Sequence, residues 1–90
     1  MSKYSLHFVG EGWEDYLFWQ KTDKKLLKKI NRILEEIQRT PFEGIAKPEL
    51  LKGDLSGAWS RRINDEHRLV YIVSDKEVRI VGCRFHYRKS

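Results

Sequence analysis

Residues 58–85 read AWSRRINDEHRLVYIVSDKEVRIVGCRF, and apolar and polar side chains alternate along most of this stretch. A period of two is typical of β-strands that bury one face. Turn-forming residues at 64–66 and 75–76 divide the stretch into three predicted strands, 58–63, 68–73 and 77–85. Strands joined by such short turns pair as an antiparallel meander.

The residues before this meander predict one more strand and two helices. Tyr4, Leu6 and Phe8 alternate with their neighbours, which suits a first strand. Apolar residues then recur at helical spacing over 12–20 and again in a longer helix, which Thr22 or Asp23 can cap. The apolar stripe of the longer helix comprises Leu26, Ile30, Ile33, Leu34 and Ile37, and Thr40-Pro41 ends it.

The expected fold is therefore of the α+β class. The N-terminal strand and the meander form a four-stranded antiparallel sheet, and the two helices pack on one face of it. Ninety residues suffice for one domain, 1–90. Segment 42–57 has no period and is longer than loops that serve only as connections.

Several global features point to the cytoplasm and away from a membrane. No apolar run approaches the roughly 20 residues that span a bilayer. The first residues lack the apolar core of a signal peptide. The single cysteine, Cys83, cannot close an internal disulfide, which is usual for proteins of reducing compartments.

The net charge of +5 is concentrated in one segment. Residues 21–32 hold six basic side chains and one acid, so this segment alone accounts for the net charge. A run of lysines is usually a solvated helix face. Here, however, Lys24, Lys25, Lys28 and Lys29 fall in the first turns of the predicted helix, where the helix dipole disfavours cations. We therefore favour a polyanionic partner.

Two arginines are expected to face each other in the first hairpin of the meander. If the turn at 64–66 has three residues, Ile63 pairs with His67 and Arg62 lies opposite Arg68. Like charges in this position are destabilising unless an anion lies between them, and guanidinium groups bind phosphate in two places. Asp65 or Glu66 could instead neutralise one arginine, and the sequence favours neither alternative.

These residue types suit the cleavage of RNA without a metal, by attack of its own 2′-hydroxyl on the adjacent phosphate. That reaction needs a base, an acid and cations around the phosphorus. The candidates are Glu49 and Lys52 in the long loop, Arg62 and Arg68 in the hairpin, and His86 and Tyr87 after the last strand.

The register of the last hairpin decides whether His86 reaches Arg68. A two-residue turn at 75–76 places Arg68 opposite Cys83, on the face that His86 avoids if the strand is regular. A three-residue turn, a bulge or a break would bring the two together.

Other side chains fit a structural role. Cys83 and His86 have a spacing seen in metal sites, but no further ligands lie beside them, so we expect no metal and a core position for Cys83. Trp13, Trp19, Trp59 and Tyr71 are expected in the core or an interface, whereas Tyr87 could stack on a base.

Blocks that together span most of the chain resemble the YoeB-type toxins, a branch of the RelE superfamily of toxin–antitoxin systems. They are 13–20 (WEDYLFWQ), 39–44 (RTPFEG), 47–49 (KPE), 55–57 (LSG), 59–63 (WSRRI), 66–71 (EHRLVY) and 83–87 (CRFHY). Departures are Leu50 and Ala58, where a proline and a larger aromatic residue are usual, and the extension Arg88-Lys89-Ser90.

The resemblance implies a compact RelE-like fold and an endoribonuclease that cleaves mRNA in the A site of the 70S ribosome without a cofactor. It implies a homodimer and a YefM-like antitoxin. It gives Glu49 the role of general base, His86 of general acid, and Arg68 of stabilising the phosphorane. Lys52 and Arg62 would hold phosphates, Tyr87 would orient the scissile nucleotide, and the four helix lysines would contact ribosomal RNA.

The alternative is a non-catalytic module that binds RNA, or that binds DNA as an autorepressor with its antitoxin. The chain has no helix-turn-helix or arm for reading a groove, so operator DNA would be bound only together with the antitoxin.

Overall fold

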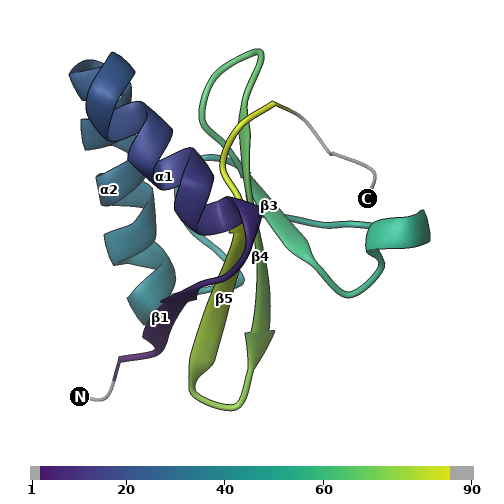
Figure 1. Cartoon of the computed structure of the whole chain (residues 1–90). Helices are drawn as coiled ribbons and strands as arrows, with labels where there is room; N and C mark the ends of the chain where they lie inside the picture. The colour runs from purple at the N-terminus through teal and green to yellow at the C-terminus, as the bar shows by residue number, and fades with distance from the viewer. Residues whose placement is uncertain (1–2, 86–90) are drawn as a thin grey trace.

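The computed structural model describes residues 3–85. Its elements follow one another as β1 (Ser5–Phe8), α1 (Glu11–Thr22), α2 (Lys24–Arg39), β2 (Glu49–Leu50), the 3-10 helix η1 (Gly53–Leu55), β3 (Trp59–Arg62), β4 (Arg68–Ser74) and β5 (Glu77–Gly82). Both helices lie on one side of the sheet (Figure 1). The helices and the meander lie where the two periods predict them, although β5 ends earlier than expected.

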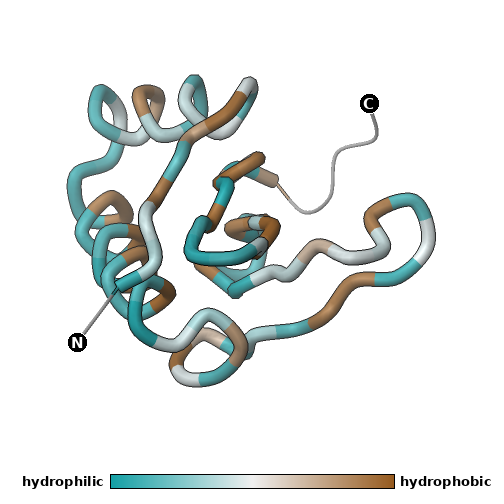
Figure 2. Tube along the Cα trace, turned by 90° about the horizontal axis from the view of Figure 1, so that it is seen from below, coloured by the Kyte–Doolittle hydropathy of each residue, from teal (hydrophilic) through white to brown (hydrophobic). Residues whose placement is uncertain are grey.

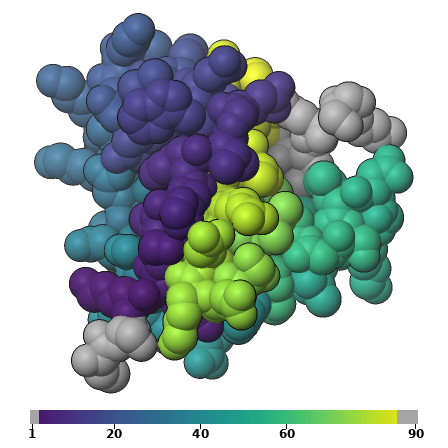
Figure 3. All heavy atoms as spheres, turned by 60° about the horizontal axis from the view of Figure 1, so that its bottom comes forward, coloured from purple at the N-terminus to yellow at the C-terminus, as the bar shows by residue number. Residues whose placement is uncertain are grey.

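The sheet has five strands in the order β1-β5-β4-β3-β2. The meander and β2 are antiparallel, whereas β1 runs parallel to β5 and lies beside it (Figure 3). The α+β class is confirmed, but the expected sheet of four antiparallel strands is corrected to a mixed sheet of five. The sequence did not predict β2, because two residues are too few to show a period. It did not predict the parallel β1–β5 pair, because parallel strands are joined by a long crossover and not by a recognisable tight turn.

Helix α1 lies close against β5 because Gly12 has no side chain. A Cβ atom at Gly12 would lie 2.0 Å from the Ile80 carbonyl oxygen. Farther along the helix, Asp15 Oδ2 accepts the Cys83 N–H at 3.0 Å, and Trp19 Nε1 donates to the Cys83 carbonyl oxygen at 2.7 Å. These two bonds fix the path of the chain where it leaves β5.

Helix α2 is amphipathic, as its stripe predicts. Asp23 rather than Thr22 caps it, since Asp23 Oδ1 accepts the Leu26 N–H at 3.0 Å. Figure 2 shows hydrophilic and hydrophobic residues alternating along the helices. The buried side chains of α2 are Ile30, Ile33, Leu34 and Ile37. Each buried aliphatic side chain stabilises the fold by about 1.5–3 kcal/mol.

The main core lies between the helices and the sheet and includes the α2 stripe, Trp19, Leu69 and Tyr71. Trp19 and Tyr71 are buried as expected, whereas Trp13 is 47% exposed. A smaller cluster of Leu51, Ala58 and Val70 occupies the other face of the sheet, because Val70 alternates with Leu69 and Tyr71 along β4. Within residues 3–85, no helix combines the length and the apolar composition needed to cross a membrane.

Candidate functional site

Arg62 of β3 and Arg68 of β4 are directly paired residues. The Ile63 N–H donates to the His67 carbonyl oxygen at 3.0 Å, so the turn between the strands has the three residues that the sequence predicts. Asn64 supports this turn, since its Oδ1 accepts the His67 N–H at 2.7 Å. The predicted pairing of the two arginines is therefore confirmed.

The two arginines have different partners. Arg62 forms an ion pair with Asp65, whose side chain is 91% exposed. Arg68 Nη1 donates to the carbonyl oxygens of Asn64 at 2.6 Å and His67 at 3.1 Å. Among the described residues, no carboxylate forms an ion pair with Arg68. A carboxylate partner thus exists for Arg62, whereas Arg68 retains a charge that an incoming anion can neutralise.

The last hairpin closes with a two-residue turn at 75–76. Its register then shifts between Val70, which pairs with Gly82, and Tyr71, which pairs with Ile80. At this step β5 has one residue more than β4, which is a β-bulge.

The bulge changes which residue faces Arg68. The Arg68 N–H donates to the Phe85 carbonyl oxygen at 2.8 Å. Cys83 is buried in the core, as predicted. Of the registers that the sequence left open, the two-residue turn with a bulge is the one observed. The residue directly before His86 is therefore bonded to Arg68, while His86 and Tyr87 lie outside the described residues.

His67 holds Phe85 from the other side. Its Nδ1 accepts the Phe85 N–H at 2.6 Å, and its ring meets the ring of Trp19 edge-on at 4.8 Å between centroids. Phe85 has φ 63°, in the left-handed region that residues other than glycine seldom adopt. We call the two backbone bonds of Phe85, to His67 and from Arg68, the Phe85 clamp.

The sequence did not predict the clamp. The sequence predicted only that His67 pairs with Ile63, and a bond from a ring nitrogen to the backbone leaves no pattern in a sequence. One signal was available: His67 directly precedes Arg68 and so points to the opposite, buried face of the sheet.

Glu49 lies on the same sheet face as the paired arginines. It pairs with Ser60, and Ser60 alternates with Arg62 along β3, so Glu49, Arg62 and Arg68 project from one face. Arg61, between Ser60 and Arg62, is buried on the opposite face, where it contacts α2. The structure thus gathers the predicted base and both predicted arginines on the face away from the helices.

Lys52 accompanies Glu49. Both are exposed, and with Leu50, Leu51 and Leu55 they line a pocket of about 300 Å³. The segment that carries them stands out from the body of the molecule (Figures 1 and 3). A long polymer can therefore reach these side chains.

The lysine cluster lies elsewhere. Lys24, Lys25, Lys28 and Lys29 are exposed in the first turns of α2, where the first turn holds no acidic residue. Because α2 covers the opposite side of the sheet (Figure 1), the cluster lies on another side of the molecule than Glu49 and Arg68. The two regions approach each other at Lys29 and Arg62, which line one pocket.

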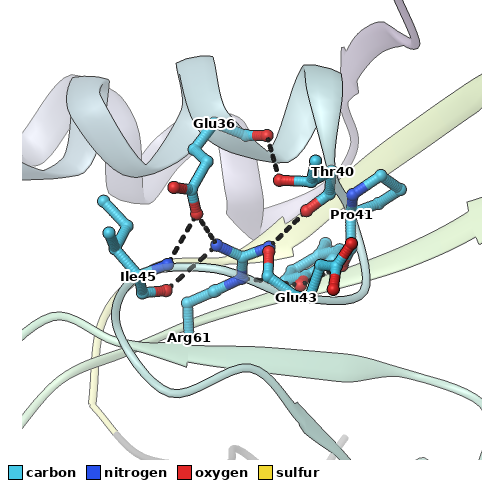
Figure 4. Close-up of polar contacts among 7 residues, drawn as sticks. Glu36, Thr40, Pro41, Glu43, Ile45 and Arg61 are labelled. Carbon is cyan, nitrogen blue, oxygen red and sulfur yellow. Dashed lines mark hydrogen bonds and ion pairs between the residues drawn. The ribbon is translucent and has the colours of Figure 1, made fainter.

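The segment before β2 is held by a buried arginine, Arg61, which is fully buried (Figure 4). A guanidinium group has five N–H donors, and all five are used. Arg61 donates to the Tyr71 hydroxyl (3.0 Å), Glu36 Oε1 (2.6 Å) and the carbonyl oxygens of Ile45 (3.0 Å), Thr40 (2.7 Å) and Glu43 (2.9 Å). This Arg61 cluster ties α2, segment 40–45 and the sheet together ahead of Glu49.

The cluster also shifts two pKa values. Desolvation raises the pKa of Glu36, but bonds from the Ile45 N–H and Arg61 outweigh it, so the net pKa is lowered. Burial raises the pKa of Tyr71, against the opposing effect of Arg61. Glu36 is thus held as a carboxylate and Tyr71 as a neutral phenol.

Metal-binding side chains do not gather in the part of the chain that the structure describes: no three His, Cys, Asp or Glu side chains there form a group that could hold a metal ion. Cys83 instead has its backbone N–H and carbonyl groups bonded to α1.

The fold is that of bacterial toxins from toxin–antitoxin systems. The structure of a YafQ mutant from Escherichia coli matches with a TM-score of 0.78 over 92% of this chain and 93% of that chain, at 18% sequence identity. At that identity the likeness shows the fold alone. The compact RelE-like fold expected from the sequence is confirmed.

The chain belongs to the YoeB-like toxins of bacterial type II toxin–antitoxin systems, whose family profile matches residues 8–87. Toxin YoeB of Escherichia coli is 61% identical over 77 residues, which cover 86% of this chain and 92% of that protein. The structure of a YoeB/ParE toxin from Agrobacterium tumefaciens is 49% identical, with a TM-score of 0.89 over 92% of this chain and 99% of that one.

Staphylococcus aureus YoeB has been solved as a dimer, which is 49% identical with a TM-score of 0.85, over 93% of this chain and 98% of that one. It has also been solved in a heterotetrameric complex with YefM antitoxin. The family resemblance stated from the sequence blocks is therefore confirmed.

Proposed function

We propose that this toxin is a ribosome-dependent endoribonuclease that cleaves mRNA in the A site and so stops translation. The observation that carries the proposal is the shared sheet face of Glu49, Arg62 and Arg68, with the Phe85 clamp directly before His86. A base, cations and the start of the segment that carries the acid converge there.

The proposed reaction needs no metal. The Glu49 carboxylate takes the proton of the 2′-hydroxyl, whose oxygen attacks the adjacent phosphorus. Arg68 stabilises the charge on the phosphorane oxygens, and Lys52 and Arg62 hold neighbouring phosphates. His86 donates a proton to the departing 5′-oxygen while Tyr87 orients the nucleotide. The products are a 2′,3′-cyclic phosphate and a 5′-hydroxyl end.

The proposed partners follow the relatives. Because Staphylococcus aureus YoeB forms a dimer and a complex with YefM, we propose a homodimer and a YefM-like antitoxin for this chain. Operator DNA would be bound only with the antitoxin, and the site of action would be the cytoplasm, where ribosomes translate.

Mapping of mRNA ends in cells tests the proposal. Wild-type protein should produce cuts within translated codons, and purified protein should cut ribosome-bound mRNA in the presence of EDTA. Replacing a general acid or base lowers the rate about 10²–10⁴-fold, so Glu49→Gln and His86→Ala should abolish visible cutting. Arg68→Ala should do the same.

Arg79→Ala serves as the matched control, because Arg79 is an exposed β5 arginine that pairs with Glu77. It should cut as the wild type does. Undiminished toxicity of Arg68→Ala and His86→Ala would refute the site assignment. Sequence-specific binding of operator DNA by this chain alone would favour the autorepressor alternative.

A further inference from the structure

A second cavity, which is lined by basic residues, lies between α2 and segment 45–47, at the edge of the sheet beside Arg62. Its volume is about 310 Å³. Strand β2 pairs with only Trp59 and Ser60 of β3 and does not extend along β3 as far as Arg62. The Arg62 N–H donates instead to the Ala46 carbonyl oxygen at 2.7 Å. The lining residues of this α2–β3 pocket are the cations Lys29, Arg32, Lys47 and Arg62 and the apolar residues Ile33, Ile45 and Ala46.

One wall of the pocket is strained and firmly held. Ala46 and Lys47 have φ 64° and 50°, a conformation that non-glycine residues keep only where the surrounding structure enforces it. Ile45, just before them, donates its N–H to Glu36 Oε1 at 2.7 Å and accepts from Arg61 at 3.0 Å (Figure 4). The Arg61 cluster therefore fixes this wall before any ligand arrives.

The lining has one sign of charge. All four ionisable residues that line the pocket are cations. Arg62 pairs with Asp65, but that carboxylate is 91% exposed, and ion pairs of this kind contribute only about 0–1 kcal/mol. An anionic ligand can therefore compete with Asp65 for Arg62 and relieve the repulsion among the lining cations.

The size of the pocket and its apolar wall indicate a ligand larger than a phosphate ion. The volume is near the lower end of the about 300–1,000 Å³ of small-ligand pockets, which suits one nucleotide. Ile45 is 39% exposed beside the cations and presents an apolar surface to the pocket. Single-stranded RNA offers this combination, a phosphate next to a base that can leave its stack.

We propose that the α2–β3 pocket is a substrate subsite that binds one nucleotide of the mRNA, next to the nucleotides at the cut. The inference rests on the proposed function. Arg62 belongs both to the pocket and to the Glu49–Arg68 face, and Lys29 belongs both to the pocket and to the lysine cluster. The RNA strand therefore runs from the cleavage face around the edge of β3 toward α2.

A binding experiment on the full chain tests this subsite. The probe is a short RNA with 2′-O-methyl riboses, which lack the attacking hydroxyl, and the readouts are its dissociation constant and the amide shifts of residues 45–47. The Arg32→Ala/Lys47→Ala double variant should weaken binding about tenfold. Its slope of log K against log salt should fall by about 0.7, since the phosphate of the bound nucleotide counts as one single-strand contact.

Two matched variants distinguish RNA binding in the α2–β3 pocket from non-specific attraction of RNA to positive charge. Lys76→Ala/Arg79→Ala removes the same charge from the β4–β5 hairpin and should leave binding unchanged. Ile45→Ala keeps every cation and should weaken RNA binding but not binding of inorganic phosphate. Equal losses in both double variants, or an Ile45→Ala protein that binds RNA normally, would overturn the proposal.

Three further outcomes distinguish the subsite from a protein-binding site and from the proposed function. If an acidic peptide binds the pocket and RNA does not compete, the site belongs to a protein partner and the subsite is refuted. If the pocket variants bind RNA normally while the wild type cuts mRNA, the subsite fails and the proposed function stands. If the pocket binds RNA as described but ribosome-bound mRNA is not cut, the proposed function fails instead.

Discussion

Phe85 is the last described residue before His86, the proposed general acid, and its backbone conformation is unusual. Its φ is positive, and its backbone N–H and carbonyl groups are bonded to His67 Nδ1 and the Arg68 N–H. An accepting Nδ1 requires that a neutral His67 carry its proton on Nε2, which lies 3.6 Å from Glu66 Oε1. We propose that His67 positions the segment that follows Phe85 and does not itself contact RNA.

Variants of His67 test this positioning role. Asparagine places Oδ1 close to where Nδ1 lies, so His67→Asn should keep the bond and most of the activity. His67→Leu leaves the Phe85 N–H without this acceptor, and kcat should fall about ten- to hundredfold with KM nearly unchanged. Cutting kinetics on ribosome-bound mRNA, with urea unfolding as the check on folding, give the answer. Equal activity of the two variants would contradict the role of the bond.

At the scale of elements, the Arg61 cluster joins α2, segment 40–45 and β3. Arg61→Met should destabilise the protein by about 3–5 kcal/mol, because it leaves Glu36 without its ion-pair partner and removes the Arg61 donor from three carbonyl oxygens. Urea unfolding at neutral pH measures this loss. A loss below about 1 kcal/mol, the range of exposed pairs, would show that the cluster does not hold these elements.

The lowered pKa of Glu36 predicts how the cluster responds to acid. A carboxyl group with a depressed folded-state pKa stabilises the fold above its unfolded pKa, near 4.5, and loses that contribution as the pH falls through the folded value. The free energy of unfolding of the wild type should therefore fall more steeply below about pH 4.5 than that of Glu36→Gln. Parallel pH profiles for the two proteins would rule out this contribution.

The same elements show what a sequence of this length can reveal. Periods of two and of 3.6 are local, so both helices, the meander and the Arg62–Arg68 pairing follow from neighbouring residues. The parallel β1–β5 pair, the bulge at Val70 and the two-residue β2 depend on contacts between distant segments. Residue types alone made Glu49 one candidate, and the family resemblance gave it the role of base. Arg61 and His67 bond to backbone groups, which no motif records.

At the scale of the whole molecule, we propose separate tasks for the lysine cluster and the Glu49–Arg68 face. Helix α2 lies on the other side of the sheet from the Glu49–Arg68 face, so Lys24, Lys25 and Lys28 should contribute affinity for the ribosome and little chemistry. Replacing these three with glutamine should weaken ribosome binding and flatten its salt dependence, while cutting of free RNA changes little. An equal fall in both activities would refute the division.

The most direct test of the proposed function removes the attacking group from the substrate. Ribosomes are programmed with two mRNAs that are identical except for one 2′-deoxy nucleotide at the mapped cut position. The protein should cut the all-ribose mRNA to a 2′,3′-cyclic phosphate and leave the 2′-deoxy mRNA intact at that position. Cleavage of the 2′-deoxy mRNA at the same bond would contradict attack by the 2′-hydroxyl and the roles proposed for Glu49 and His86.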